Sequence, residues 1–103
     1  MVGNTMLAFE TGAPGEVRLA GRLDAAQAGA AQSFMDGTSG AVTLDCSKLE
    51  YISSAGLGVL LKTHKRLLAG SGKLRLVAVS PHLRDIFKYS GFDQIFEIES
   101  PPQ

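Results

Sequence analysis

A stretch of leucines with helical spacing constrains the fold of this chain more than any other feature. Its apolar members recur at intervals of three and four residues: Leu57, Leu60, Leu61, Leu67 and Leu68. Lys62 and Arg66 fall on the other side, so we expect an amphipathic helix with its leucine face against a core. Ser53 and Ser54 stand where such a helix needs an N-cap, and the glycines of 69–72 predict its end.

Strand and helix patterns alternate on both sides of this helix. Strands are expected over 6–11, 16–24, 41–46, 73–79 and 94–98, and two further helices over 25–35 and 81–90. Asp24 and Ser80 are expected to cap those two helices. Such alternation predicts a layered α/β fold, and right-handed crossovers place the helices that follow Cys46 and Val79 on the same face of the sheet.

The composition limits the classes of protein to which the chain can belong. Its 103 residues fit one domain, expected over 1–103 with an ordered core at about 6–99 and short tails. Lys and Arg number 10 and Asp and Glu number 10, so no cationic surplus favours nucleic acid or a membrane surface. Cys46 is the single cysteine, which excludes an intrachain disulfide and a cysteine-rich metal site. The apolar runs are too short for direct membrane insertion and the N-terminus is unlike a signal peptide, so we expect a cytoplasmic protein.

The motifs of common catalytic and cofactor sites are incomplete in this sequence. GSGK at 70–73 lacks the earlier glycine and the following Ser or Thr of a phosphate-binding loop. ISSAG at 52–56 lacks the first glycine of a nucleophile elbow, and His64 lies about 15 Å along the helix from Ser54. The two histidines do not have metal-ligand spacing, and we expect His64 and Cys46 to be buried packing residues. We therefore expect no catalytic residue, no cofactor and no metal, and keep a small serine hydrolase as an alternative.

Three stretches of the chain resemble a known family, and they follow one another along the chain in the order that the family has. LDCSKLEYISSAGLGVLL at 44–61 resembles the central motif of the STAS domain, the fold of bacterial anti-sigma factor antagonists. RLAGRLD at 18–24 is similar to the strand of that family that ends in Gly-x-Leu-Asp. VAVSPHLRDIFKYSGFDQIFEI at 77–98 is similar to its Ser-Pro helix, closing glycine and last strand. The resemblance implies a STAS fold, which is an α/β fold with a mixed sheet of four to five strands and helices mainly on one face.

The resemblance also implies a function that depends on a serine. In the family, a serine at the start of the central helix is phosphorylated by a partner that is both serine kinase and anti-sigma factor, with an ATPase-type domain. The common pattern Asp-Ser-Ser-Gly-Leu, laid on 53–57, makes Ser54 the acceptor and Ser53 the alternative. The chain would then be an anti-anti-sigma factor and not an enzyme. Unphosphorylated, it would bind the anti-sigma factor and free the sigma factor; phosphorylation would end binding, and a serine phosphatase would restore it.

The same resemblance places a partner surface around the two serines. The residues expected there are Arg22, Asp24, Ser53, Ser54, Ala55, Gly56 and Leu57. The small residues Ala55, Gly56 and Gly58 would let a partner backbone approach closely. Arg22 stands where family members often carry an acidic residue. Asp45, expected at the end of its strand, would orient the serine loop.

Two further expectations concern assembly. Many members of the family continue into another helix after the last strand, where this chain has ESPPQ, so we expect a monomer or a weak homodimer. The alternative function within the family is a STAS subunit of a membrane transport complex. Such a subunit docks to a permease or an ATPase without needing phosphorylation.

Overall fold

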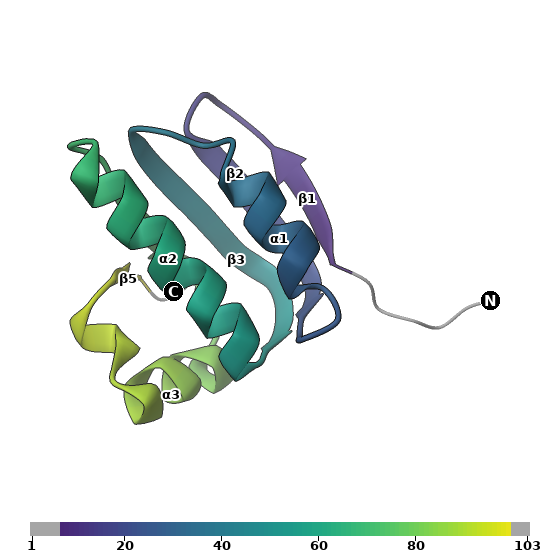
Figure 1. The fold of residues 1–103 in the computed structure, drawn as a ribbon. Coiled ribbons are helices and arrows are strands. Elements are labelled where there is room, and N and C mark those ends of the chain that lie inside the picture. Colours follow the sequence, from purple (N-terminus) through teal and green to yellow (C-terminus); the bar gives the residue numbers. More distant parts are fainter. Residues whose placement is uncertain (1–6, 100–103) are drawn as a thin grey trace.

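The computed structural model describes residues 7–99, which form a sheet flanked by three helices (Figure 1). The strands are β1 (Ala8–Thr11), β2 (Glu16–Leu23), β3 (Ala41–Ile52), β4 (Lys73–Val77) and β5 (Glu97–Ile98). The helices are α1 (Ala28–Met35), α2 (Ser54–Ala69) and α3 (Pro81–Ser90), followed by a short 3₁₀ turn, Phe92–Gln94.

The sheet has five strands in the order β1-β2-β3-β4-β5, so its spatial order follows the chain. β1 is antiparallel to β2, and every other pair is parallel and joined through a helix. Because successive right-handed crossovers advance in one direction, they place their helices on the same face. Figure 1 shows α1 and α2 side by side in front of the sheet, with α3 across the end at which α2 begins. The expected α/β fold with a mixed sheet is confirmed.

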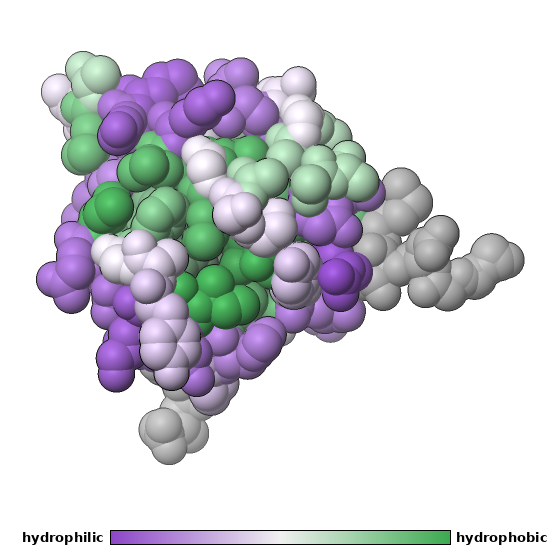
Figure 2. All heavy atoms as spheres, turned by 60° about the horizontal axis from the view of Figure 1, so that its bottom comes forward, coloured by the Kyte–Doolittle hydropathy of each residue, from purple (hydrophilic) through white to green (hydrophobic). Residues whose placement is uncertain are grey.

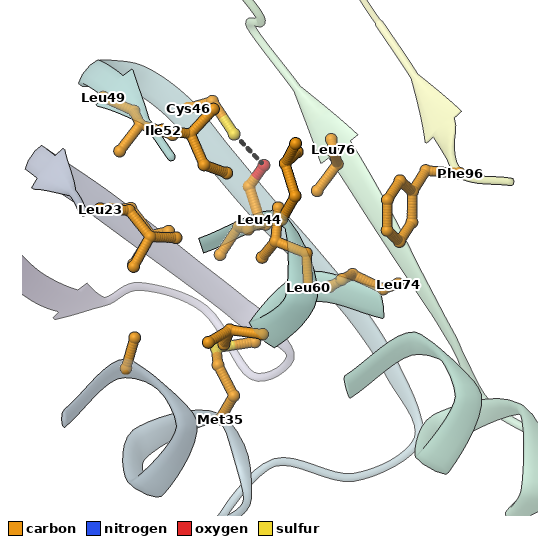
Figure 3. Close-up of a cluster of buried hydrophobic side chains, with 14 of the residues drawn as sticks. Leu23, Met35, Leu44, Cys46, Leu49, Ile52, Leu60, Leu74, Leu76 and Phe96 are labelled. Atoms are coloured by element: carbon orange, nitrogen blue, oxygen red, sulfur yellow. Dashed lines mark hydrogen bonds between the residues drawn. The ribbon is translucent and has the colours of Figure 1, made fainter. Parts of the chain in front are cut away.

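The core lies between the sheet and the helices. The inward side chains of β2, β3 and β4 alternate with outward ones, and the leucine stripe of α2 packs on them. Figure 3 shows Leu44, Leu60, Leu74 and Leu76 converging in this layer. Cys46 lies among them, and burial raises the pKa of its thiol to about 12. It is a small buried apolar residue, as expected.

His64 is also buried in this layer, on the leucine side of α2. Its Nδ1 accepts a hydrogen bond of 3.2 Å from the backbone N–H of Leu74, and its ring meets that of Phe96 edge-on at 5.1 Å. The expectation that His64 is a packing residue is confirmed.

Within residues 7–99, no helix covers the opposite face of the sheet, and its outward side chains are mostly polar. Arg18 lies there between two carboxylates, with its Nε 3.4 Å from Asp45 and its Nη1 3.4 Å from Glu10. We call this surface the bare face. Its outward residues on β3 begin with Ala41 and Thr43, because Val42 and Leu44 point into the core.

Several boundaries differ from those expected. β3 continues to Ile52, because its pairing with β2 resumes after two irregularities of register. α1 begins only at Ala28, and its N-cap is Gln27, not Asp24 as expected. The side chain of Asp24 instead accepts the N–H of Gln27 in the turn of residues 25–27. The remaining strands are shorter than expected: β1 starts at Ala8, β4 stops at Val77, and the 3₁₀ turn occupies the start of the segment expected as β5. Met6 and the tails expected at both ends lie outside the described residues.

Candidate functional site

The carboxyl ends of β2 and β3 lie side by side and position the two serines. Leu23 is opposite Ile52 in the register, and the carbonyl of Leu23 accepts the N–H of Ser53 at 2.9 Å. Asp24 therefore leaves β2 next to the point at which Ser53 leads β3 into α2. We call this region the serine end. Figure 2 shows the molecule from this side, with hydrophobic and near-neutral side chains gathered in the middle and hydrophilic ones around them.

The two serines have different surroundings. Ser53 is the N-cap of α2: its hydroxyl oxygen accepts the N–H of Gly56 at 3.3 Å and lies 3.4 Å from the carbonyl of Leu23. Ser54 is the first helical residue and is exposed. Among residues 7–99, no hydrogen bond within the protein uses the Ser54 hydroxyl. The hydroxyl of Ser53 thus holds the helix start, whereas that of Ser54 faces solvent.

Two residues expected at the partner surface are instead buried. Gly56 packs against β2, and a Cβ atom there would lie 2.6 Å from the carbonyl oxygen of Leu23. Leu57 keeps only 7% of its surface exposed because it belongs to the leucine stripe. These two residues therefore do not belong to the exposed surface: both serve the contact between α2 and the sheet.

Ala55 is exposed, as expected for a residue of the proposed partner surface, and it borders a groove between α1 and α2. The groove has a volume of about 280 Å³ and is lined largely by small residues of both helices, including Ala28, Gly29 and Gly58. A Cβ on Gly58 would meet no atom within 4 Å. Of the three small residues expected to allow a close approach, Ala55 and Gly58 line this groove, whereas Gly56 faces the sheet.

Asp24 and Arg22 flank the serine end on the β2 side. Asp24 Oδ1 accepts the N–H of Gln27 at 3.1 Å, and its Oδ2 lies 3.8 Å from Arg22 Nε. Arg22 is exposed, and its guanidinium carbon lies 4.3 Å from the centre of the Tyr51 ring. Tyr51 was missed at the sequence level, because only the β2–β3 register brings it to Arg22.

The expected role of Asp45 is corrected by the structure. Asp45 lies within β3 on the bare face, well before the serine loop, where its Oδ1 accepts the N–H of Ser47 at 2.8 Å. It therefore orients an irregularity of the β2–β3 pair and not the loop. Partial burial raises the pKa of Asp45, but hydrogen bonds from Ser47 and the charge of Arg18 outweigh it, so the pKa lies below its usual value.

The described residues contain no group of three or more His, Cys, Asp or Glu that could hold a metal ion. Neither histidine within 7–99 hydrogen-bonds to Ser53 or Ser54, and the accepting nitrogen of His64 is taken by the backbone of β4. No helix in this part of the chain is long and apolar enough to cross a bilayer. The serine end therefore offers an accessible hydroxyl beside a helix N-terminus, and no histidine of the described residues is hydrogen-bonded to it.

The first turn of α2 provides a favourable place for an anion. A helix N-terminus exposes unpaired N–H groups and a partial positive charge. This first turn contains no acidic residue. Negative charge added to the Ser54 side chain would therefore be tolerated by the fold itself.

Comparison with known proteins gives consistent matches. The anti-sigma factor antagonist BtrV of Bordetella bronchiseptica is 47% identical over 57 residues, which cover 55% of this chain and 49% of that protein. The match thus spans about half the length of this relative. An anti-sigma factor antagonist from Mycobacterium paratuberculosis has the same fold, with a TM-score of 0.76 and 23% identity over 96% of this chain and 87% of that one.

The phosphorylated form of SpoIIAA, a Bacillus cell fate determinant, also shares the fold. Its TM-score is 0.65, with 20% identity over 90% of each chain. The family model described as "Mlab, STAS domain" matches residues 7–98, nearly all of the part that the structure describes. This chain belongs to the STAS domain family.

Proposed function

We propose that this chain is an anti-sigma factor antagonist whose binding is switched by phosphorylation of Ser54. Unphosphorylated, it binds an anti-sigma factor that is also a serine kinase with an ATPase-type domain, and so frees the sigma factor. Phosphorylated, it releases that partner until a serine phosphatase removes the phosphate. The chain acts in the cytoplasm as a substrate and binding module, and not as an enzyme.

The observation that carries this proposal is that the two serines have different surroundings: the Ser53 hydroxyl caps α2, whereas Ser54 is exposed. A kinase needs a hydroxyl that it can reach and that the fold does not use. Ser54 is exposed and outside the intramolecular hydrogen bonds of residues 7–99, whereas Ser53 bonds the N–H of Gly56. Phosphorylation of Ser53 would remove an N-cap, which contributes about 1 kcal/mol. Ser54 is therefore the acceptor, and Ser53 is the alternative.

The same geometry explains how phosphorylation changes binding without changing the fold. A phosphate brings a charge of about −1.5 to −2. At the amino end of α2 this charge is stabilised by the helix N-terminus. Against a docked partner it must lose its water, and a penalty of only about 1.4 kcal/mol weakens binding tenfold. The phosphate thus acts on the interface.

The relatives support this proposal by their names. The Bordetella and Mycobacterium proteins are both called anti-sigma factor antagonists. SpoIIAA has been solved in a phosphorylated form, so a protein of the same fold accepts a phosphate. The partner surface proposed here comprises Arg22, Asp24, Ser54 and Ala55, with Ser53 as its structural support.

The test is intact-mass spectrometry after incubation with purified anti-sigma factor kinases and Mg-ATP. Wild type and Ser53→Ala should each gain one phosphate, and Ser54→Ala none. Binding should persist in Ser54→Ala and be lost in Ser54→Asp. Tight binding to the kinase without phosphorylation, unchanged in Ser54→Asp, would contradict the switch. Binding to a permease or an ATPase of a transport complex, with none to the kinases, would favour the docking subunit. Covalent labelling of Ser54 by a fluorophosphonate probe would favour a hydrolase.

A further inference from the structure

The side chains of Arg22 and Tyr51 lie in contact at the border of the serine end. They are opposite each other in the β2–β3 register, one residue before the Leu23–Ile52 pair that leads to Ser53. The register shifts just before them, and Gly21 adopts a φ of 101°, a conformation that favours glycine. Irregularities of this kind re-aim the side chains that follow. Here they bring the guanidinium of Arg22 over the ring of Tyr51.

The contacts of Arg22 restrict its side chain but leave its terminal nitrogens available. The guanidinium lies over the Tyr51 ring at 4.3 Å, within the range of a cation–π interaction. Only Nε faces an internal carboxylate, that of Asp24, at the long distance of 3.8 Å. Asp24 Oδ1 is already bonded to the N–H of Gln27. No hydrogen bond of Arg22 side-chain nitrogens occurs among residues 7–99, and 45% of the side chain is exposed.

We infer that Arg22, held on Tyr51, is the anchor for a carboxylate side chain of the protein that docks on the serine end. This inference rests on the proposed function, because it names the chemistry of the same partner. The planar guanidinium presents a fork of N–H donors that matches a carboxylate, and stacking on an aromatic ring reduces the entropy lost on binding. Arg and Tyr, together with Trp, are also enriched among the few residues that dominate interface energies.

The anchor also couples binding to the phosphate. The residues between Asp24 and α1 that reach the surface here are Ala25 and Ala26, which carry no charge. The partner carboxylate on Arg22 and a phosphate on Ser54 would then be two anions at one small interface. Their repulsion adds to the desolvation of the phosphate. Arg22 therefore makes the partner sensitive to the modification as well as attracting it.

The test measures the Kd of the anti-sigma factor kinase that binds the wild-type chain, by titration calorimetry. Arg22→Gln should weaken binding about tenfold or more, and Arg22→Glu further, since one buried charge pair commonly has that effect. Arg22→Lys should recover only part of the affinity, because it keeps the charge and loses the fork. Tyr51→Leu should weaken binding less than Arg22→Gln. Added salt should reduce the affinity of wild type more steeply than that of Arg22→Gln.

Lys65→Gln is the matched control, because Lys65 is an exposed cation on α2 and the change removes the same charge. Its Kd should equal that of wild type, and thermal unfolding should show that each variant is folded. Equal affinity of folded Arg22→Gln and wild type would overturn the anchor. If that variant still loses binding through Ser54→Asp, the proposed function stands and only the anchor fails. If no anti-sigma factor kinase binds the wild-type chain, both the anchor and the proposed function are contradicted.

Discussion

The hydroxyl oxygen of Ser53 accepts the backbone N–H of Gly56 at 3.3 Å, and this bond separates the roles of two adjacent serines. Ser53→Ala should lower the free energy of unfolding by about 1 kcal/mol, because α2 loses its cap. Ser54→Ala should leave it nearly unchanged, since the exposed hydroxyl has no partner in the described fold. Urea unfolding of both variants gives the comparison. Equal losses of unfolding free energy in the two variants would show that both hydroxyls help to cap α2.

Gly56 and Gly58 lie two residues apart on α2 and should respond oppositely to alanine. A Cβ at position 56 would meet the carbonyl oxygen of Leu23 at 2.6 Å, so Gly56→Ala should destabilise the fold by about 1–3 kcal/mol. A Cβ at position 58 meets nothing within 4 Å, so Gly58→Ala should stabilise the helix by about 0.5–1 kcal/mol. Thermal or urea unfolding measures both, and effects of the same sign would contradict this packing.

Arg66 connects the far ends of α1 and α2. Its Nη2 donates to the carbonyl of Met35 at 2.7 Å and lies 3.2 Å from the hydroxyl of Thr38, so it caps the last turn of α1. Arg66→Met should cost about 1 kcal/mol of unfolding free energy and raise amide exchange in α1. Lys65→Met, at the exposed neighbouring position, is the control. Unchanged exchange in α1 would show that the cap is dispensable.

Asp45 should make stability depend on pH in the acid range. Its pKa is lowered in the folded state, so the stabilisation is complete above the ordinary value of 3.8 and is lost as the pH falls through the lower folded pKa. Asp45→Asn should therefore unfold with a weaker dependence on pH below about 4 than wild type. The measurement is the urea midpoint against pH. Parallel curves for the two proteins would mean that Asp45 does not contribute.

The local features of this fold were predictable from sequence, and the features that depend on register were not. The leucine period and the paired serines fixed α2 and its start within a residue, because helix capping and amphipathicity are local. Ser80, Pro81 and Gly91 likewise marked the two ends of α3, and the structure has them as N-cap, first residue and left-handed C-cap. The continuation of β3 beyond Cys46 was missed because irregular pairing interrupts the alternation of its residues.

That missed continuation accounts for the errors in the site. Once β3 is taken to end at Cys46, Asp45 is expected beside the serine loop, although it lies inside the strand. The Arg22–Tyr51 contact is invisible for the same reason, since its two residues meet only through the register of β2 and β3. The burial of Gly56 depends on how closely α2 approaches β2, which no pattern of residue types records.

The bare face and the buried thiol together make the protein convenient to label or to immobilise through a single introduced cysteine. Cys46 is almost completely buried, and its thiol, with a pKa near 12, is unreactive while the protein is folded. A cysteine introduced at Ala41 would therefore be the only thiol open to a maleimide among residues 7–99. Ala41 begins the strand whose other end leads into Ser53. A dye or a sensor surface coupled there would leave the serine end clear for an arriving protein.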